Sequence, residues 1–129
     1  MKNFKTSFLF LRLPMAISLL GHGLVRLPKL TTFAEGMVSS MEVSMLPAVL
    51  IRPFGYVLPI VEALLGLTLL MGFQIRYTLY ASLALMSILV LGSSSVENWG
   101  AVQAQLVHAI YLFGLLWYYE KYTVQKEGA

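Results

Sequence analysis

The feature that most constrains this chain is a series of four apolar runs, each close to the length needed to cross a membrane. They cover approximately residues 8–27, 55–73, 77–91 and 99–119. A helix of about 20 residues, rising about 1.5 Å per residue, spans a hydrocarbon core of about 30 Å. Because lipid offers no hydrogen-bond partners, the backbone N–H and C=O groups of each run must bond to one another, as they do in a helix. The sequence therefore predicts an all-α integral membrane four-helix bundle, with residues 1–129 forming a single domain.

Composition supports lipid as the solvent and narrows the chemistry. The chain is 58% hydrophobic and 12% charged, whereas a soluble domain is about 25% charged. It has no cysteine, which excludes disulfides, thiolate metal sites and cysteine redox centres. Its Lys and Arg residues flank the apolar runs instead of forming a basic patch, so we expect a lipid bilayer as partner and no nucleic acid.

Residues 28–54 connect the first two runs and are too polar to span a membrane. Thr32 followed by Glu35 predicts a helix capping box, and Pro47 and Pro53 are expected to end this segment. An apolar stripe recurs at every fourth position, at Phe33, Met37, Met41 and Met45. This spacing predicts an amphipathic helix that lies in the membrane interface.

The distribution of basic residues predicts the orientation. One side of the membrane would carry Lys2, Lys5, Arg76, Lys121 and Lys126. The opposite side would carry Arg26, Lys29 and Arg52, and its serine-rich loop has neither Lys nor Arg. By the positive-inside rule, both termini are cytoplasmic and the amphipathic segment is periplasmic.

Antiparallel threading of the four runs brings several polar residues to one depth. His22 and Arg26 lie near the outer end of the first run, Glu62 lies in the second, and His108 lies in the fourth with Gln105 three positions before it. From helical rise, His22, Glu62 and His108 fall within about 5 to 10 Å of each other in depth. A carboxylate within a membrane needs a partner inside the bundle, and Arg26 or one of the histidines can supply it. These five residues form the predicted ligand-binding cluster.

Several interpretations of this cluster are open. A small amphipathic ligand such as a quinone headgroup could bind there, with histidine and glutamate exchanging protons. The alternative is a structural ion pair that fixes helix register. Two histidines on different helices could also ligate a b-type haem, and His22, Glu62 and His108 have the ligand types of a zinc site, but no spacing signature supports either, so no metal site is assigned. Motifs for nucleotide-dependent or hydrolytic chemistry are absent, and no catalytic residue is identified.

Three stretches make the chain resemble the DoxX family of small bacterial membrane proteins. They are GHGLVRLPKLTTFAEGM (Gly21 to Met37), PIVEALLGLTLLMGFQIR (Pro59 to Arg76) and QLVHAIYLFGLLWYY (Gln105 to Tyr119). The resemblance implies a bundle in the bacterial inner membrane and a link to quinone-coupled redox work, since the family includes relatives of the small subunit of thiosulfate:quinone oxidoreductase. The positions that it carries over are Arg26, Glu62 and Gly66.

Together these inferences predict a small membrane subunit, not catalytic alone, that supports quinone-linked redox chemistry of a partner enzyme. A protein partner or a homo-oligomer is expected. The alternative is a non-enzymatic scaffold or assembly factor, with the stripe of Phe33, Met37 and Met41 as its docking surface. A transporter or channel is disfavoured, because the interior has no second polar layer toward the cytoplasm.

Overall fold

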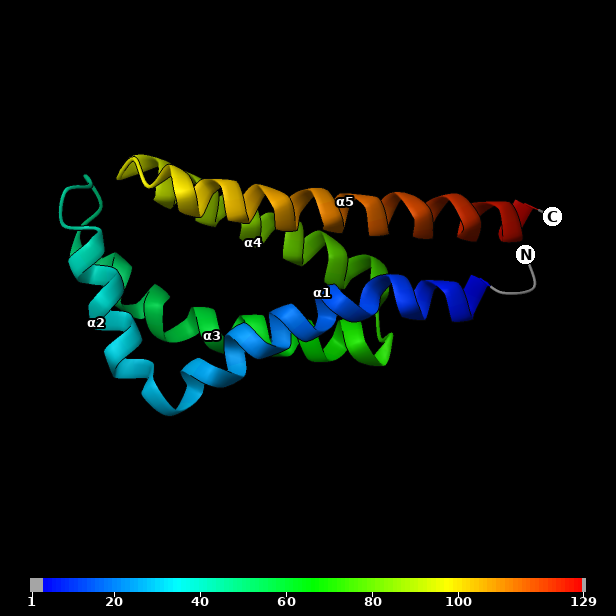
Figure 1. Ribbon diagram of the computed structural model, residues 1–129, viewed down its shortest axis with the longest axis horizontal. Coiled ribbons are helices and arrows are strands. Elements are labelled where there is room, and N and C mark those ends of the chain that lie inside the picture. Colours follow the sequence, from blue (N-terminus) through cyan, green and yellow to red (C-terminus); the bar gives the residue numbers. More distant parts are fainter. Residues whose placement is uncertain (1–3, 129) are drawn as a thin grey trace.

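The computed structural model describes residues 4–128, and their side chains through residue 123. These residues form α1 (Phe4–Arg26), a short 3-10 helix η1 (Leu27–Lys29), α2 (Leu30–Ser40), α3 (Ala48–Met71), α4 (Ile75–Ser95) and α5 (Trp99–Gly128) (Figure 1). Four helical stretches within the described residues are long and apolar enough to cross a membrane, the first of which runs from α1 through α2. The prediction of an all-α four-helix membrane bundle is confirmed, and α2 is the helical segment that precedes the second span.

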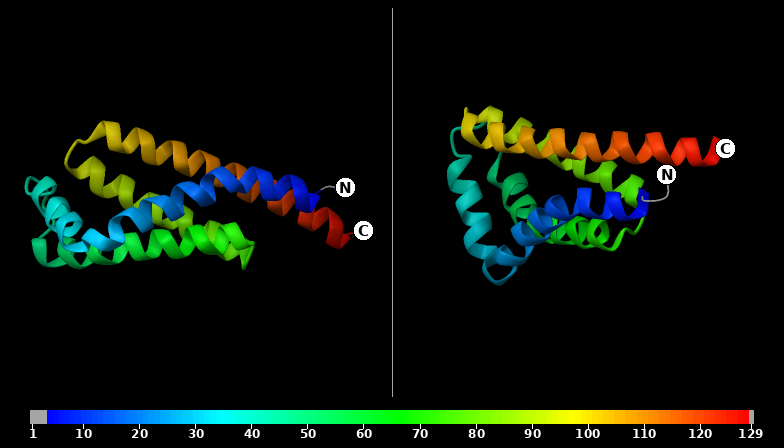
Figure 2. Two further views of the ribbon diagram at one scale, coloured as in Figure 1. Left: turned by 60° about the horizontal axis from the view of Figure 1, so that its bottom comes forward. Right: turned by 45° about the vertical axis from the view of Figure 1, so that its right-hand side comes forward.

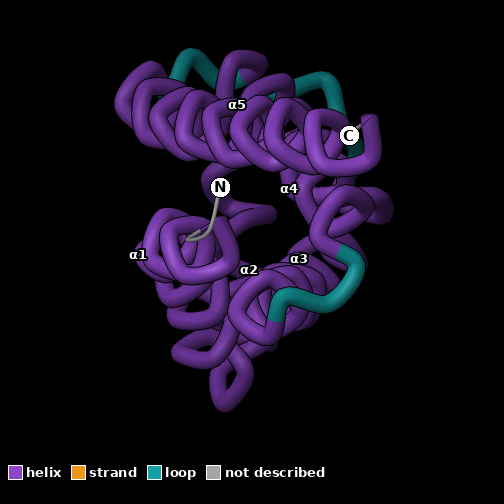
Figure 3. Tube along the Cα trace, turned by 90° about the vertical axis from the view of Figure 1, so that its right-hand side faces the viewer, coloured by secondary structure: helices purple, strands orange, loops and turns teal. Residues whose placement is uncertain are grey.

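The helices are arranged as two layers that meet at an angle. α1 packs against α3 in one layer, and α4 packs against α5 in the other. The layers lie close together at the end that carries both termini and diverge toward α2, which stands across the open end (Figures 1 and 2). Viewed from the termini, α5 lies on the opposite side of the molecule from α1 and α3 (Figure 3). We call the divergent end the α2 end.

Large side chains hold the layers together at the terminal end. The fully buried residues include Phe8 from α1, Leu69 from α3, Leu79 from α4 and Leu112 from α5. The ring of Phe8 also stacks on that of Tyr118 in α5, with ring centroids 6.3 Å apart. Bulky side chains thus fill the space where the two layers meet.

The turn between α3 and α4 joins the layers at the same terminal end. Gly72 adopts a left-handed conformation with φ of +75°, which glycine tolerates without strain. Its N–H donates to the carbonyl of Leu69 at 3.2 Å, and the N–H of Phe73 donates to the carbonyl of Thr68 at 2.9 Å. This is a Schellman motif, which ends α3 and reverses the chain into α4.

Two details of the segment between α1 and α3 differ from expectation. α3 begins at Ala48 instead of Gly55, with Pro53 inside its second turn, where the missing N–H removes one backbone hydrogen bond. The predicted capping box is wrong, because Thr32 lies inside α2 and the Glu35 carboxylate accepts from Arg52 Nε at 2.6 Å and Nη2 at 3.2 Å. This ion pair ties α2 to the first turns of α3.

Candidate functional site

The divergence of the two layers leaves a cavity of about 820 Å³ at the α2 end, with walls from all five α-helices. Small residues on α4 and α5 make room for it: Gly92, Ser93, Ala101 and Ala104. Most of the remaining wall is apolar and includes Phe33, Met37, Met41, Phe54, Leu58 and Met86. All five residues of the predicted cluster line the same cavity: His22, Arg26, Glu62, Gln105 and His108.

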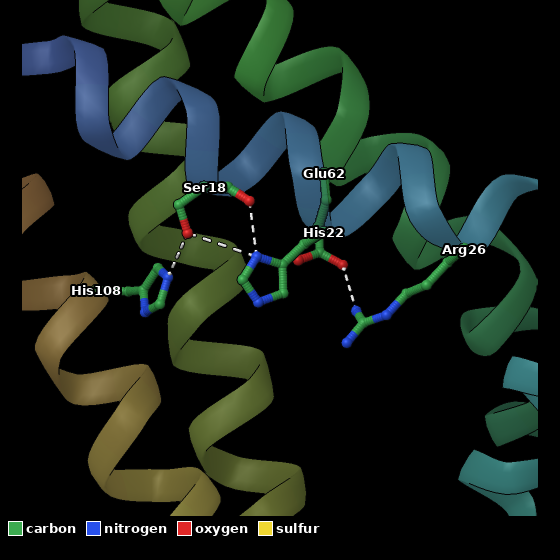
Figure 4. A network of polar contacts seen from close by, with 5 residues as sticks. All are labelled: Ser18, His22, Arg26, Glu62 and His108. Atoms are coloured by element: carbon green, nitrogen blue, oxygen red, sulfur yellow. Dashed lines mark hydrogen bonds and ion pairs between the residues drawn. The ribbon is translucent and has the colours of Figure 1, made fainter.

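Arg26 and Glu62 form an ion pair across the contact between α1 and α3. Arg26 Nη1 donates to Glu62 Oε1 at 3.1 Å (Figure 4). The Glu62 side chain is only 6% exposed and that of Arg26 is 29% exposed, so the carboxylate is the more buried partner. The guanidinium carbon of Arg26 lies 4.4 Å from the ring centroid of Phe33, a cation–π contact that holds the arginine from the α2 side. Of the partners that the sequence allowed for Glu62, the structure selects Arg26.

Close packing of α1 on α3 is what brings this pair together. A Cβ atom on Gly23 would lie 2.5 Å from the backbone nitrogen of Ala63, and one on Gly66 would overlap the backbone of Leu20. Glycine at these two positions lets the helix backbones touch, as small residues do between membrane helices. The Arg26 side chain then reaches Glu62 on the adjacent helix of its own layer.

The two histidines meet through Ser18 of α1. The rings of His22 on α1 and His108 on α5 are nearly perpendicular, with centroids 5.8 Å apart. Ser18 Oγ lies 3.1 Å from His108 Nε2 and 3.5 Å from His22 Nδ1 (Figure 4). Ser18 therefore links the layer of α1 and α3 to the layer of α4 and α5 beside the ion pair.

Gln105 lies on the α5 wall of the cavity. Its Nε2 donates to Ser93 Oγ at 2.9 Å, which ties α5 to α4. Its Oε1 is buried and has no hydrogen-bond partner among the residues that the structure describes. An unpaired buried acceptor of this kind costs free energy unless a donor reaches it.

The carboxylate and the two imidazoles of the cluster are each engaged by other side chains or by the backbone. Across the described part of the chain, no three His, Asp or Glu side chains converge as metal ligands. The Glu62 carboxylate is engaged by Arg26, and each imidazole is hydrogen-bonded to Ser18.

Comparison with known families classifies the chain. The family model described as methylamine utilisation protein MauE matches residues 5–104. The chain belongs to the MauE family. Searches of curated proteins and of solved structures found no match.

Membership of the MauE family corrects the resemblance to DoxX proteins, which is wrong. The stretches that carried the resemblance contain a glycine at the helix contact, Gly66, and the arginine and glutamate that pair, Arg26 and Glu62. Any bundle that buries an ion pair between two closely packed membrane helices needs such residues. They therefore do not distinguish one family of four-helix membrane proteins from another.

The MauE match covers α1 to α4 and the start of α5, and so it includes His22, Arg26 and Glu62. Gln105 and His108 lie just beyond it, although they line the same cavity. The cavity of this MauE-family chain is thus completed by a helix that is mostly outside the matched region.

Sequence reasoning left two contributors to this site, Ser18 and Phe33, out of the predicted cluster. Ser18 lies on the same helix face as His22, but its bridging contact to His108 depends on how α1 and α5 cross. Phe33 was assigned to an interfacial stripe, whereas it lines the cavity and covers Arg26. In this MauE-family chain, Phe33, Met37 and Met41 all line the cavity.

The cavity combines two kinds of surface. Broad apolar walls suit a hydrophobic body, and the polar wall offers an imidazole, a guanidinium and an amide to a polar head. Such a site in a MauE-family protein suits an amphipathic molecule.

Proposed function

We propose that this MauE-family protein is a small membrane subunit that binds a quinone-type ligand at the α2 end and supports the redox chemistry of a partner enzyme. The observation that carries the proposal is the cavity itself, which has His22, Arg26 and His108 on one polar wall among apolar ones. A quinone has the matching shape, because its ring and tail are apolar and its two oxygens are polar.

Size and hydrogen-bonding capacity support this ligand class. A volume of about 820 Å³ lies within the range of about 300 to 1,000 Å³ that is typical of small-molecule sites. The Arg26 guanidinium has about five N–H donors, only one of which is used on Glu62 among the described residues. The others remain for a ligand oxygen. In this proposal Glu62 positions Arg26 and does not itself contact the ligand, since its carboxylate is buried against that arginine.

A partner enzyme is part of the proposal because the chain has no cysteine for redox chemistry of its own. The family takes its name from methylamine utilisation, and we infer that the partner belongs to that process. The distribution of Lys and Arg favours an inner-membrane protein with both termini in the cytoplasm and with the cavity toward the periplasmic side.

Ligand binding by the purified full-length protein in lipid nanodiscs tests the proposal. A short-chain ubiquinone is titrated into wild-type protein and into the variants Glu62→Gln and His108→Ala. We expect each variant to bind at least about tenfold more weakly, equivalent to about 1.4 kcal/mol. Glu62→Gln removes the carboxylate that positions Arg26, and His108→Ala removes an imidazole ring from the cavity wall. Glu120→Gln is the matched control, since Glu120 pairs with Arg76 at the terminal end and is remote from the cavity. Wild-type affinity in both test variants would contradict the proposal.

A non-enzymatic assembly factor is the second candidate. The observation that favours it is that Arg26 and Glu62 are already paired, as a purely structural cluster requires. This candidate expects a protein partner to co-purify equally well with wild-type protein and with His108→Ala, and no ubiquinone to bind. The titration above therefore separates the two candidates.

A further inference from the structure

Ser18 connects the two imidazoles into one hydrogen-bonded chain. It lies one turn before His22 on α1, and its hydroxyl oxygen is 3.1 Å from Nε2 of His108 on α5. The same oxygen is 3.5 Å from Nδ1 of His22. No other hydroxyl contacts either imidazole within the part of the chain that the structure describes.

Before any proton transfer, hydrogen bonds to the backbone set the tautomer of both histidines. Nδ1 of His22 lies 2.7 Å from the carbonyl oxygen of Ser18, and Nδ1 of His108 lies 2.9 Å from the carbonyl oxygen of Ala104. A carbonyl oxygen only accepts, so each Nδ1 must carry a hydrogen. In the neutral imidazole the other nitrogen, Nε2, is then an acceptor.

These tautomers give the chain of hydrogen bonds one direction. Since Nε2 of His108 accepts, the Ser18 hydroxyl must donate to it. The lone pairs of Ser18 Oγ then face the Nδ1–H of His22. Nε2 of His22 has no hydrogen-bond partner among the described side chains, and His22 lines the cavity. This series of hydrogen bonds therefore begins with a free acceptor, Nε2 of His22, at the ligand site and ends at His108.

We propose that His22, Ser18 and His108 form a relay that removes a proton from a hydroxyl-bearing headgroup in the cavity. This inference rests on the proposed ligand site and narrows its ligand to the reduced, quinol form. The ligand O–H bond breaks as an N–H bond forms at Nε2 of His22. The Nδ1 proton of His22 leaves its contact with the Ser18 carbonyl oxygen and passes to Ser18 Oγ, and the Ser18 proton passes to Nε2 of His108. His22 therefore changes tautomer during the transfer. The positive charge ends on His108, and the negative charge stays on the ligand oxygen, so no electron is gained or lost in this step.

The charged neighbours of His22 are compatible with this transfer. Arg26 and Glu62 lie beside it on α1 and α3 as a closed ion pair (Figure 4). The pair has no net charge, and Arg26 keeps further N–H donors for the ligand oxygen that has lost its proton. Ser18 is thus a positioning residue that acts through the two histidines.

The experiment measures ligand binding and ligand oxidation separately. Full-length protein in nanodiscs receives less than one equivalent of a short-chain ubiquinol, and ferricyanide is then added as a one-electron oxidant. Loss of the phenolic proton precedes electron loss, so we expect Ser18→Ala to bind ubiquinol within about twofold of wild type but to oxidise it at least about tenfold more slowly. Ser18→Thr keeps a hydroxyl and should recover most of the rate. The matched control is Ser87→Ala, because among the described residues the Ser87 hydroxyl bonds only to its own helix, at the carbonyl of Leu83.

Three results separate this inference from the proposed function. If the wild type binds neither ubiquinone nor ubiquinol, both the proposed function and the relay are overturned. Binding with an unchanged oxidation rate in Ser18→Ala would overturn the relay alone. If Ser18→Ala does not fold, nitrogen NMR of the wild-type histidines decides, because hydrogen on Nε2 of neutral His108 would overturn the relay and hydrogen on Nδ1 of both histidines would support it.

Discussion

At the scale of single residues, Glu62 determines much of what this chain must do. An ionised carboxylate in the middle of a membrane helix is costly, by about 2.5 to 3.5 kcal/mol on insertion scales. Arg26 offsets that cost from the end of α1, and Phe33 holds the arginine in place. The pair therefore links α1, α2 and α3 at one point.

Removing one member of this ion pair is expected to lower the free energy of unfolding much more than removing both members does. Arg26→Met leaves the Glu62 charge buried without a partner and should destabilise the protein by about 3 to 5 kcal/mol. The double variant Arg26→Met with Glu62→Met should recover most of that loss. Thermal unfolding in lipid nanodiscs measures both.

A second ion pair supplies the control. Glu35 and Arg52 are 50% and 45% exposed, and loss of an exposed pair costs about 0 to 1 kcal/mol. Arg52→Met should therefore leave the midpoint of unfolding almost unchanged. A double variant no more stable than Arg26→Met alone would contradict the assignment of Glu62 as the buried, dependent charge.

The ion-pair partner of Glu62 could be predicted from the sequence only in part. Helical rise placed His22, Glu62 and His108 at similar depths, with Arg26 one turn from His22, which left two kinds of partner open. Depth does not specify rotation about the helix axis, and rotation decides which side chain reaches the carboxylate. The glycine contacts at Gly23 and Gly66 fix that rotation, and the sequence does not specify which residues of the opposite helix these glycines meet.

At the scale of helices, the contact between α1 and α3 depends on glycine. Gly66→Ala would place a methyl group on the backbone of Leu20, which has no flexible atoms to move aside. We expect a loss of about 1 to 3 kcal/mol from overpacking, together with weaker ligand binding as α1 shifts. Unfolding and ubiquinone titration of the same preparation measure the two effects.

Gly114→Ala on α5 is the matched substitution, because a Cβ atom there meets nothing within 4 Å. It should leave stability within about 1 kcal/mol of wild type, on the scale of helix propensity. Equal losses from the two substitutions would show that the close approach of α1 and α3 is not the cause.

Helix boundaries between α1 and α3 illustrate a limit of local signals. The sequence pattern correctly indicated a helix around Phe33 and Met37, since periodicity is a local property. It misread Glu35 as a capping residue, because the competing partner, Arg52, is distant in the sequence. Pro53 is predicted to end the connecting segment, but it lies inside α3, because a proline in the second turn of a helix removes just one hydrogen bond.

At the scale of the whole molecule, the cavity depends on α2 lying across the gap between the two layers. The terminal carbon of Met41, the residue that directly follows α2, lies 3.8 Å from where a Cβ atom on Gly92 of α4 would be. Cysteines at these two positions should be joined efficiently by a short bismaleimide in intact membranes, and the chain has no other cysteine to compete. The joined protein should exchange ubiquinone more slowly, because α2 and α4 can no longer separate.

Met45 provides the control position for that crosslink. It is completely exposed and lies a few residues further along the chain. Met45→Cys with Gly92→Cys should crosslink poorly in comparison. The extent of crosslinking is measured from the mobility of the protein on a denaturing gel. Equal crosslinking of both cysteine pairs would contradict the position of α2 across the gap.

The angle between the two layers could not be predicted from the sequence. Four spans and their antiparallel order follow from run lengths and connections, but the angle between layers depends on the size of facing side chains. Phe8 and Tyr118 fill the terminal end, whereas Gly92 and Ala104 leave the α2 end open. The residues of the ligand site could therefore be predicted, while the size and shape of the cavity beside them could not.

Because the two layers are joined at the terminal end, a rotation there changes the distance between them at the α2 end. With 24 residues, α3 is about 36 Å long, so a rotation of roughly 5° at the terminal end moves its far end by about 3 Å. A displacement of that size is close to the thickness of an aromatic ring. A small rotation where the layers join therefore changes the width of the cavity by about the amount that admits or excludes a flat headgroup.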